Sequence, residues 1–452
     1  MSLASTLSPP APASATDRIP GRARATAWLR ARARTTPGLL RILSVGLGAA
    51  IVLLWIAAFA AVLVRDHAVH AVSTDAGPAF AAAQRLHADL SEADATVASG
   101  FLDGPVEPTA RRKAYDASIA AAQNELRTLA GTGGSRATND ALTTLHREIP
   151  VYTGLIGQAR ADNRLGLVVG GAYLRHASQL MQGTILPAAD SLAASSAEQI
   201  DDEYRHATSW VHVVLVSVAG VATLAALVAV QLWLFRRTHR ILNVPLLVAS
   251  ALVAVTFAVT LSAFTAERAR LVDGRDHGFV PMTEIAQARV LGLRAWGDQS
   301  MSLIARGDGA ALDEDADRVA ARLGYTPEGE PIDDGVLRTI TDASVERGVP
   351  GAGIEQRWQD YQKISIKVRG AVRHAGKFAD ARKLALNDGA TAFGRFDTAA
   401  DEAFLASQAR FNGRLAAAGD RLTGLAIVVS VVSALCLLLT LIGIQARINE
   451  YR

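Results

Sequence analysis

The sequence predicts an all-α membrane protein with four transmembrane helices and two tandem extracytoplasmic four-helix bundles. Three observations support this fold class. Four long apolar stretches lack acidic and basic residues, the pieces between them alternate in size and charge, and the two large pieces have helical periodicity. Strand signals are almost absent, because neither large piece has alternating Val, Ile and Thr runs bounded by Asn-Gly turns.

The apolar stretches cover residues 42–64, 210–235, 241–265 and 422–445. Each has more than twenty residues, and a helix of that length crosses a hydrocarbon core of about 30 Å. We therefore expect four transmembrane helices, separated by an N-terminal extension (1–41), two large pieces (65–209 and 266–421), a hinge (236–240) and a tail (446–452).

Charge predicts the orientation. The extension, the hinge and the tail together carry a net charge of +10, whereas 65–209 carries −5 and 266–421 carries −2. Arginine and lysine concentrate on the cytoplasmic side of membrane proteins. We expect a multi-pass plasma-membrane protein with both termini in the cytoplasm and both large pieces outside.

Arginines beside the spans are the candidates for cytoplasmic docking and for contact with anionic lipids of the inner leaflet. The candidates are Arg30, Arg32, Arg34, Arg41, Arg236, Arg237 and Arg240. Their position also explains the isoelectric point near 9.1, so no nucleic-acid partner is expected.

Cysteine and arginine usage indicate the setting of the protein. The single cysteine, Cys436, falls within the fourth span, so neither outer piece is held together by disulfides. Each outer piece is long enough for an ordinary hydrophobic core. The 41 arginines against five lysines, with abundant alanine, are typical of a high-GC bacterial genome.

The chain reads as an internal duplication of span, outer bundle and span. Ala83, Leu90 and Phe101 match Ala286, Leu293 and Ile304 at a constant offset of 203 residues. Further on, an offset of 209 residues matches five apolar positions, Leu145, Ile149, Tyr152, Leu155 and Ala159, to Ile354, Trp358, Tyr361, Ile364 and Val368.

Periodicity predicts four helices in each outer bundle. The first bundle has them near 65–102, 107–130, 136–163 and 168–209, and the second near 266–306, 310–323 (with a looser stretch to 347), 354–376 and 379–421. The first and last helix of each bundle should continue into a span. The proline- and glycine-rich segment 324–351 is expected to be a longer loop at the far end of the second bundle, or a contact for an external protein.

No catalytic or metal-binding constellation is found. Asp313-Glu314-Asp315-Ala316-Asp317 resembles the start of an EF-hand loop, but Arg318 replaces the turn glycine and Gly324 replaces the bidentate glutamate. The spans carry no charged residue of the kind that ion-coupled carriers keep at mid-membrane. We expect no enzyme activity, no cofactor and no metal, and the pattern does not identify ligand-binding residues.

Each span–bundle–span unit resembles the four-helix-bundle sensory module of bacterial chemoreceptors and histidine kinases, and two fused units would mimic a receptor dimer. The complete layout resembles the actinobacterial GlnX-type membrane proteins. That resemblance implies a protein between an extracytoplasmic glutamine/glutamate-binding lipoprotein and the cytosolic Ser/Thr protein kinase G. No short motif carries the resemblance, so no functional residue is transferred.

The expected function is therefore a non-enzymatic relay that couples extracytoplasmic sensing of glutamate-, glutamine- or aspartate-like amino acids, through a solute-binding lipoprotein, to a cytosolic Ser/Thr protein kinase. Two alternatives stay open, a structural scaffold of the cell envelope and a direct sensor of a small ligand without a binding protein. A homo-oligomer is compatible with all three of these functions.

Overall fold

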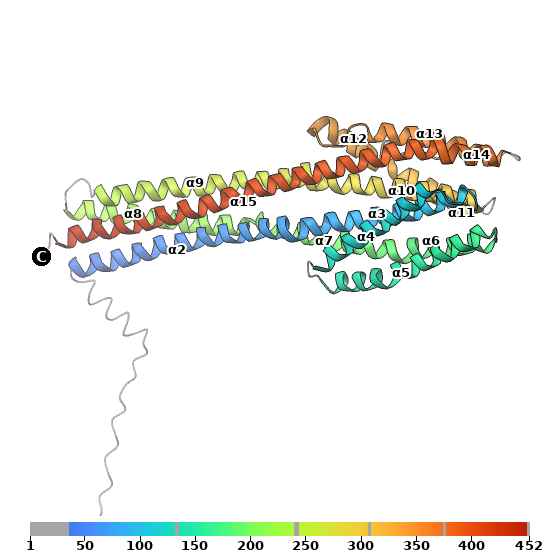
Figure 1. Ribbon diagram of the computed structural model, residues 1–452. Coiled ribbons are helices and arrows are strands. Elements are labelled where there is room, and N and C mark those ends of the chain that lie inside the picture. The colour runs from blue at the N-terminus through green and yellow to red at the C-terminus, as the bar shows by residue number, and fades with distance from the viewer. Residues whose placement is uncertain (1–35, 132–134, 239–243, 306–308, 374–376, 450–452) are drawn as a thin grey trace, which may run out of the picture. The chain divides into compact units, whose positions relative to one another are not determined.

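The computed structural model describes residues 36–131, 135–238, 244–305, 309–373 and 377–449 (Figure 1). Within these ranges the chain is helical and contains no strand, only an isolated bridge between Tyr325 and Pro331. The all-α prediction is confirmed.

Among the described residues, four helices are long and apolar enough to cross a membrane. They are α2 (Thr36–Ala71), α8 (Trp210–Thr238), α9 (Val244–Gly274) and α15 (Ala390–Asn449). Residues 239–243, which include the predicted start of the third span, lie outside the described part. By contacts the chain divides into a membrane unit (described parts of 1–60, 211–261 and 427–452) and a bundle unit (61–210 and 262–426).

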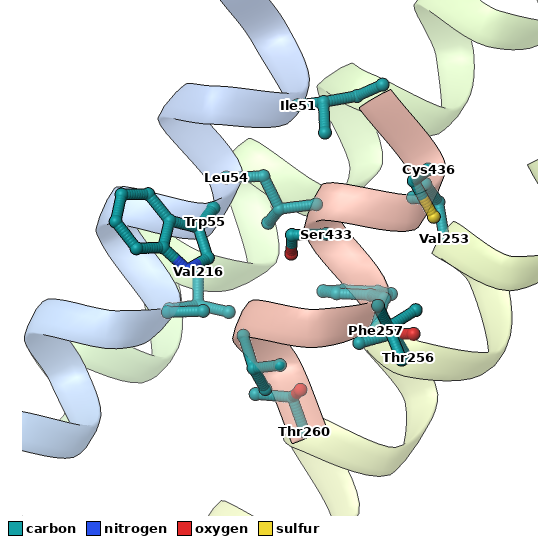
Figure 2. Close-up of a pocket in the computed structure, with 13 residues that line it drawn as sticks. Ile51, Leu54, Trp55, Val216, Val253, Thr256, Phe257, Thr260, Ser433 and Cys436 are labelled. Carbon is teal, nitrogen blue, oxygen red and sulfur yellow. The ribbon is translucent and has the colours of Figure 1, made fainter. Parts of the chain in front are cut away.

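Close packing and hydrogen bonds between helices hold the membrane unit together. A Cβ on Gly220 would lie 2.4 Å from the ring of Phe257, so only glycine allows α8 to approach α9 this closely. Gln231 donates to Leu246 O at 3.0 Å and to Ser250 Oγ at 2.8 Å, as expected for a polar residue in a span. A cavity of about 30 Å³ remains beside Trp55, Thr256 and Cys436, with room for about one water molecule (Figure 2).

The first half of the bundle unit follows the predicted order of helices. It comprises α3 (Gly77–Leu102), α4 (Thr109–Gly131), α5 (Arg136–Arg164), α6 (Val169–Leu180) and α7 (Leu186–Ala207). Leu86, Leu90, Leu145, Tyr152 and Ile156 are fully buried in one core, so apolar residues at helical spacing form the inner face of these helices.

The second half repeats this order but differs from the prediction in its second helix. It comprises α10 (Val280–Ala305), α11 (Ala310–Leu323), α12 (Val336–Arg347), α13 (Ile354–Arg373), α14 (Phe378–Leu384) and the first part of α15. The segment 324–351 was expected to be a loop, but it contains α12, which buries Leu337 and Ile340.

The expected place of segment 324–351 at the far end of the bundle is also wrong. Gly348 accepts a hydrogen bond from Arg410 Nη1 at 2.5 Å, and Arg410 lies late in the bundle part of α15. The turn after α12 therefore lies at the end where α15 continues toward its apolar stretch. The prediction failed because the loop is shorter than expected. Gly324, at φ +104°, ends α11, and the chain then forms a further helix, α12.

Within the described ranges, four π-helical turns interrupt the long helices, although regular helices were expected there. They are η1 (Val72–Ala76), η2 (Met181–Ile185), η3 (Arg275–Phe279) and η4 (Ala385–Gly389). Pro78, Pro187 and Pro281 each follow the start of a π turn by six residues. A proline inside a helix has no N–H and clashes with the carbonyl four residues earlier, and the wider π turn relieves that clash.

Three of the four helical junctions between bundle and apolar stretch are continuous, as predicted. The fourth is interrupted, because α7 ends at Ala207 and α8 begins at Trp210. Thr208 Oγ1 bonds to Tyr204 O at 2.7 Å, and such side-chain bonds compete with the helical pattern. The two-residue break at Thr208–Ser209 corrects the expected continuous helix.

Candidate functional site

The two halves of the bundle unit meet along α3 and α10, which run parallel. The rings of Phe80 and Phe279 pack in a tilted arrangement, with centroids 5.0 Å apart, near the start of the pair. Near the middle, a Cβ on Gly297 would lie 3.5 Å from Ala95 Cβ, and Leu102 and Leu303 share a cluster at the end. That distance is an ordinary van der Waals contact, so the two helices pack directly against each other there.

A polar cleft of about 450 Å³ opens along this seam, between α3 and α10 and under η2, α7 and α11. Four pairs of its lining residues are 203 residues apart, which is the offset found in the sequence. The pairs are Phe80 with Thr283, Gln84 with Gln287, His87 with Val290 and Ser91 with Arg294. The cleft therefore lies where residues of the two halves that are 203 positions apart line the same space.

Acidic, basic and neutral hydrogen-bonding side chains line the cleft. His87 Nε2 lies 3.2 Å from Asp190 Oδ1, and its Nδ1 lies 3.3 Å from Ser91 Oγ. The side chains of Gln84, Gln287 and Arg322 have no hydrogen-bond or salt-bridge partner among the described residues. A small ligand that has both a carboxylate and a donor group could be bound by this set.

Gln182 connects the cleft to a buried carboxyl group. It belongs to η2, lines the cleft and donates to Asp94, which is buried in the first half. Asp94 also accepts from Tyr152 Oη at 3.1 Å and from Ser178 Oγ at 2.8 Å. Burial raises the pKa of Asp94, and these three hydrogen bonds oppose the rise. A change at Gln182 would be felt at this network.

A charged cluster lies on the other side of the α3–α10 pair. Arg289 donates to Asp397 at 2.7 Å and to Asp401 at 2.5 Å. Burial, then the charge of Glu92, raises the pKa of Asp89 to about 7. The seam is therefore bordered by ionisable groups, and its packing energy depends on their protonation.

A second raised pKa belongs to Asp298 of α10. Burial, then the neighbouring carboxylate of Asp315, raises the pKa of Asp298 to about 8. Asp315 in turn is held by Arg294 at 2.6 Å and Arg318 at 2.9 Å. The acidic run that resembled an EF-hand lies in the helix α11, where it forms these ion pairs.

The structure describes only some of the arginines proposed for cytoplasmic docking. Arg41 is exposed on α2, Arg236 is exposed near the end of α8, and Arg237 lies in the last turn of α8. Arg30, Arg32, Arg34 and Arg240 lie outside the described residues.

The cleft residues were not found from the sequence. Polar side chains at Gln84, His87, Ser91 and Gln287 interrupt an otherwise apolar helix face. The signal that could have found them is the 203-residue offset, because it aligns Gln84 with Gln287 on the seam.

A protein family described as an actinobacterial sensor domain matches residues 68–205. The matched stretch begins near the end of α2 and extends through η1 and α3 into α7, so it covers the first half of the bundle unit. No curated protein and no solved structure matches the chain. The family match indicates a role in sensing or signalling. With four membrane-capable helices it fits an actinobacterial sensor membrane protein.

Proposed function

We propose that the chain is a non-enzymatic transmembrane sensor, which reports amino acids outside the cell to a separate partner inside it. The observation that carries this proposal is the polar cleft on the α3–α10 seam. Each seam helix continues through a π turn, η1 or η3, into a helix long and apolar enough to cross a membrane. A ligand at the seam thus acts on the two helices that lead to the apolar stretches.

The π turns supply a way to pass a small displacement. Conversion of a π turn to α-helix shifts one side by one residue, about 1.5 Å along the axis and about 100° around it. Signalling shifts of about 1–2 Å are typical when a packed interface has two arrangements. A coupling free energy of about 1–3 kcal/mol would be sufficient.

Two partners complete the proposed relay, and the resemblance to GlnX-type proteins supports both. An amino-acid-binding lipoprotein would deliver the stimulus outside, and a cytosolic Ser/Thr protein kinase would receive it inside. Charge distribution supports an arrangement with both termini in the cytoplasm. Arg41 and Arg236 would then lie exposed at the inner surface, beside anionic lipids and available to the kinase.

A second candidate is direct sensing, in which the amino acid binds the cleft without a binding protein. The unpartnered Gln84, Gln287 and Arg322 favour it, because their side chains line the cleft and their hydrogen-bonding groups are available to a ligand. The internal duplication remains an interpretation in either case. It is supported by η1 and η3, which begin 203 residues apart.

Thermal unfolding of the full chain in lipid nanodiscs tests the proposal. L-glutamate, L-glutamine and L-aspartate are added with and without the binding lipoprotein. A ligand that binds the folded state raises the midpoint, by an amount equivalent to about 2.7 kcal/mol at one hundred times Kd. Direct sensing predicts a shift without the lipoprotein, and this shift is lost in Gln84→Ala/Gln287→Ala but kept in the exposed control Gln123→Ala. The relay predicts a shift only with the lipoprotein.

Kinase output in cells provides the second readout. Arg236→Gln/Arg237→Gln/Arg240→Gln should reduce the response of the kinase to amino acids, after labelling has shown that the variant keeps its orientation. If no shift occurs under any condition and kinase output ignores amino acids, the chain is a scaffold and the sensing proposal fails.

A further inference from the structure

One end of the first half carries an unusual group of exposed aliphatic side chains on two neighbouring turns. Val106 lies in the α3–α4 turn and is 83% exposed, and Val168, in the α5–α6 turn, is 95% exposed. Asn163 Nδ2 donates to Gly104 O at 3.0 Å and joins the two turns. We call this surface the tip, and it consists of Val106, Leu165, Leu167, Val168 and Val169.

The α5–α6 turn is well defined, so its aliphatic residues are held outward. Gly166 adopts φ +68°, its N–H bonds to Asn163 O at 3.0 Å, and the N–H of Leu167 bonds to Asp162 O at 2.9 Å. These two bonds are those of a Schellman motif, which ends α5 sharply. A Cβ on Gly170 would lie 2.9 Å from Ala159 O, so the start of α6 is fixed closely against α5.

Basic side chains border the tip. Arg112 and Arg164 are exposed and have no partner within the described ranges. They line a groove of about 510 Å³ between α4 and α5, together with Arg160. Arg160 is only 9% exposed, lies 4.3 Å over the ring of Tyr115 and binds Glu107 at 2.8 Å. Arg112 and Arg164 therefore offer unpaired positive charge beside an apolar surface, whereas the charge of Arg160 is balanced by Glu107.

We propose that the tip is the docking surface for an extracytoplasmic protein whose own apolar patch is bordered by carboxylates. The proposal rests on the sensing function proposed above and names the surface that receives the external partner. An apolar centre with a charged rim is the usual anatomy of a protein interface. Arg112 and Arg164 would steer and orient an acidic rim.

Two other occupants are disfavoured, one by these charges and one by the position of the tip. A second copy of the chain docked tip to tip would bring Arg112 and Arg164 against their own equivalents, and like charges across an interface are repulsive. The membrane that the chain crosses is disfavoured because the tip lies at the end of α3 opposite to its continuation into α2. A soluble or lipid-anchored protein remains.

The test places a photo-crosslinking amino acid at position 168 of the full chain, in living cells of the source bacterium. The matched control position is 345, because Val345 is equally apolar and 82% exposed but lies on α12 of the second half. We expect a covalent adduct with one extracytoplasmic protein from position 168 and none from position 345. Arg112→Glu/Arg164→Glu should lower the yield at least tenfold, and a lysine-for-acid exchange in the adduct-forming face of the partner should lower it similarly.

Binding of that purified partner to the chain in nanodiscs gives the affinity. Val168→Asp should weaken binding at least tenfold, and Val345→Asp should leave it unchanged. The proposal would be overturned if position 168 gave no adduct, or gave adducts only with lipid or with other copies of this chain. It would also be overturned if position 345 gave an equal yield, or if the charge reversal left the yield unchanged. Docking without any change in kinase output refutes the sensing function and leaves the docking surface standing. An amino-acid response without docking refutes the docking surface and leaves the sensing function standing.

Discussion

The guanidinium carbon of Arg65 lies 4.2 Å from the ring centroid of Phe264, and Arg65 is only 3% exposed. Arg268, 203 residues later, lies 4.5 Å over the ring of Trp210. Arg65 directly follows the apolar stretch 42–64, and Arg268 comes three residues after the end of the stretch 241–265. The two cation–π contacts thus involve arginines that are 203 residues apart, the offset found in the sequence.

Replacement of Arg65 by alanine should destabilise the bundle unit. A desolvated cation–π contact contributes about 2 kcal/mol, and truncation of a buried arginine also removes the packing of its methylene groups. We expect Arg65→Ala to lower the unfolding midpoint in nanodiscs by several degrees, and Arg65→Lys to lower it less. The exposed Arg205 provides the control, because Arg205→Ala should shift the midpoint by less than a degree. Equal midpoints for Arg65→Ala and Arg205→Ala would contradict this assignment.

Gly292 should tolerate no side chain, because α10 packs on the ring of Phe396 there. A Cβ on Gly292 would lie 2.3 Å from Phe396 Cε1, so the ring would have to move. Overpacking of this kind costs about 1–3 kcal/mol. Gly394, in α15 near the same ring, has open space around the position of a Cβ, and Gly394→Ala should stabilise by about 0.5–1 kcal/mol. Chemical denaturation of both variants measures the two signs, and a neutral Gly292→Ala would show that the α10–α15 contact is looser than described.

Raised carboxyl pKa values make the fold more stable in acid than at neutral pH. In the folded chain the pKa of Asp298 is raised to about 8 and that of Asp89 to about 7, from 3.8 for both residues when unfolded. The folded state therefore holds more protons between these values. Its added stability is complete below about pH 4 and is lost as pH rises through 7 and 8. Each group contributes a slope of at most about −1.4 kcal/mol per pH unit.

Unfolding midpoints between pH 5 and pH 9 measure this slope. Asp298→Asn and Asp89→Asn should each make this slope shallower, because an amide side chain does not titrate in this pH range. Asp342→Asn, at an exposed position of α12, should leave the slope as it is in the wild type. A midpoint that rises with pH over this range in the wild type would reverse the assigned direction.

The fold class and most helix positions could be predicted from the sequence, because hydrophobic periodicity directly reports which face of a helix is buried. The predicted helix at 310–323 coincides with α11, and those at 107–130 and 136–163 differ from α4 and α5 by at most two residues. The helix α12 was missed because glycine and proline between Gly324 and Gly335 suggested a loop. These residues lie only before the start of α12, and Leu337 and Ile340 are buried on the inner face of that helix.

The candidate site could not be predicted because it depends on the contact between two halves of the chain. Gln84 and Gln287 are unremarkable on separate helices and become a pair only when α3 and α10 pack in parallel. The π turns were missed for a related reason. A proline within an apolar-periodic stretch was compatible with a continued helix, and only the packing on both sides holds the extra residue in place. Pro78 and Pro281, at the 203-residue offset, were the available signal.

Removal of one residue from η1 should leave a folded chain. In η1 the N–H of Gly77 bonds to Val72 O, five residues earlier, so the turn holds one residue more than an α-helical turn. Deletion of the exposed Thr74 lets the helix close in the α-helical register with the packing on both sides preserved. Pro78→Ala must accompany the deletion, because proline in a regular helix costs about 3 kcal/mol.

The matched control deletes Thr143, an exposed residue in the regular helix α5. That deletion rotates everything after it by about 100° and moves Leu145, Ile149 and Tyr152 away from the core. We expect cooperative unfolding within about 5 °C of the wild type for the Thr74 deletion with Pro78→Ala, and loss of cooperative unfolding for the Thr143 deletion. If the π turn also transmits the signal, the first variant should be folded but unresponsive to amino acids. A variant that folds and responds normally would confine η1 to a structural role.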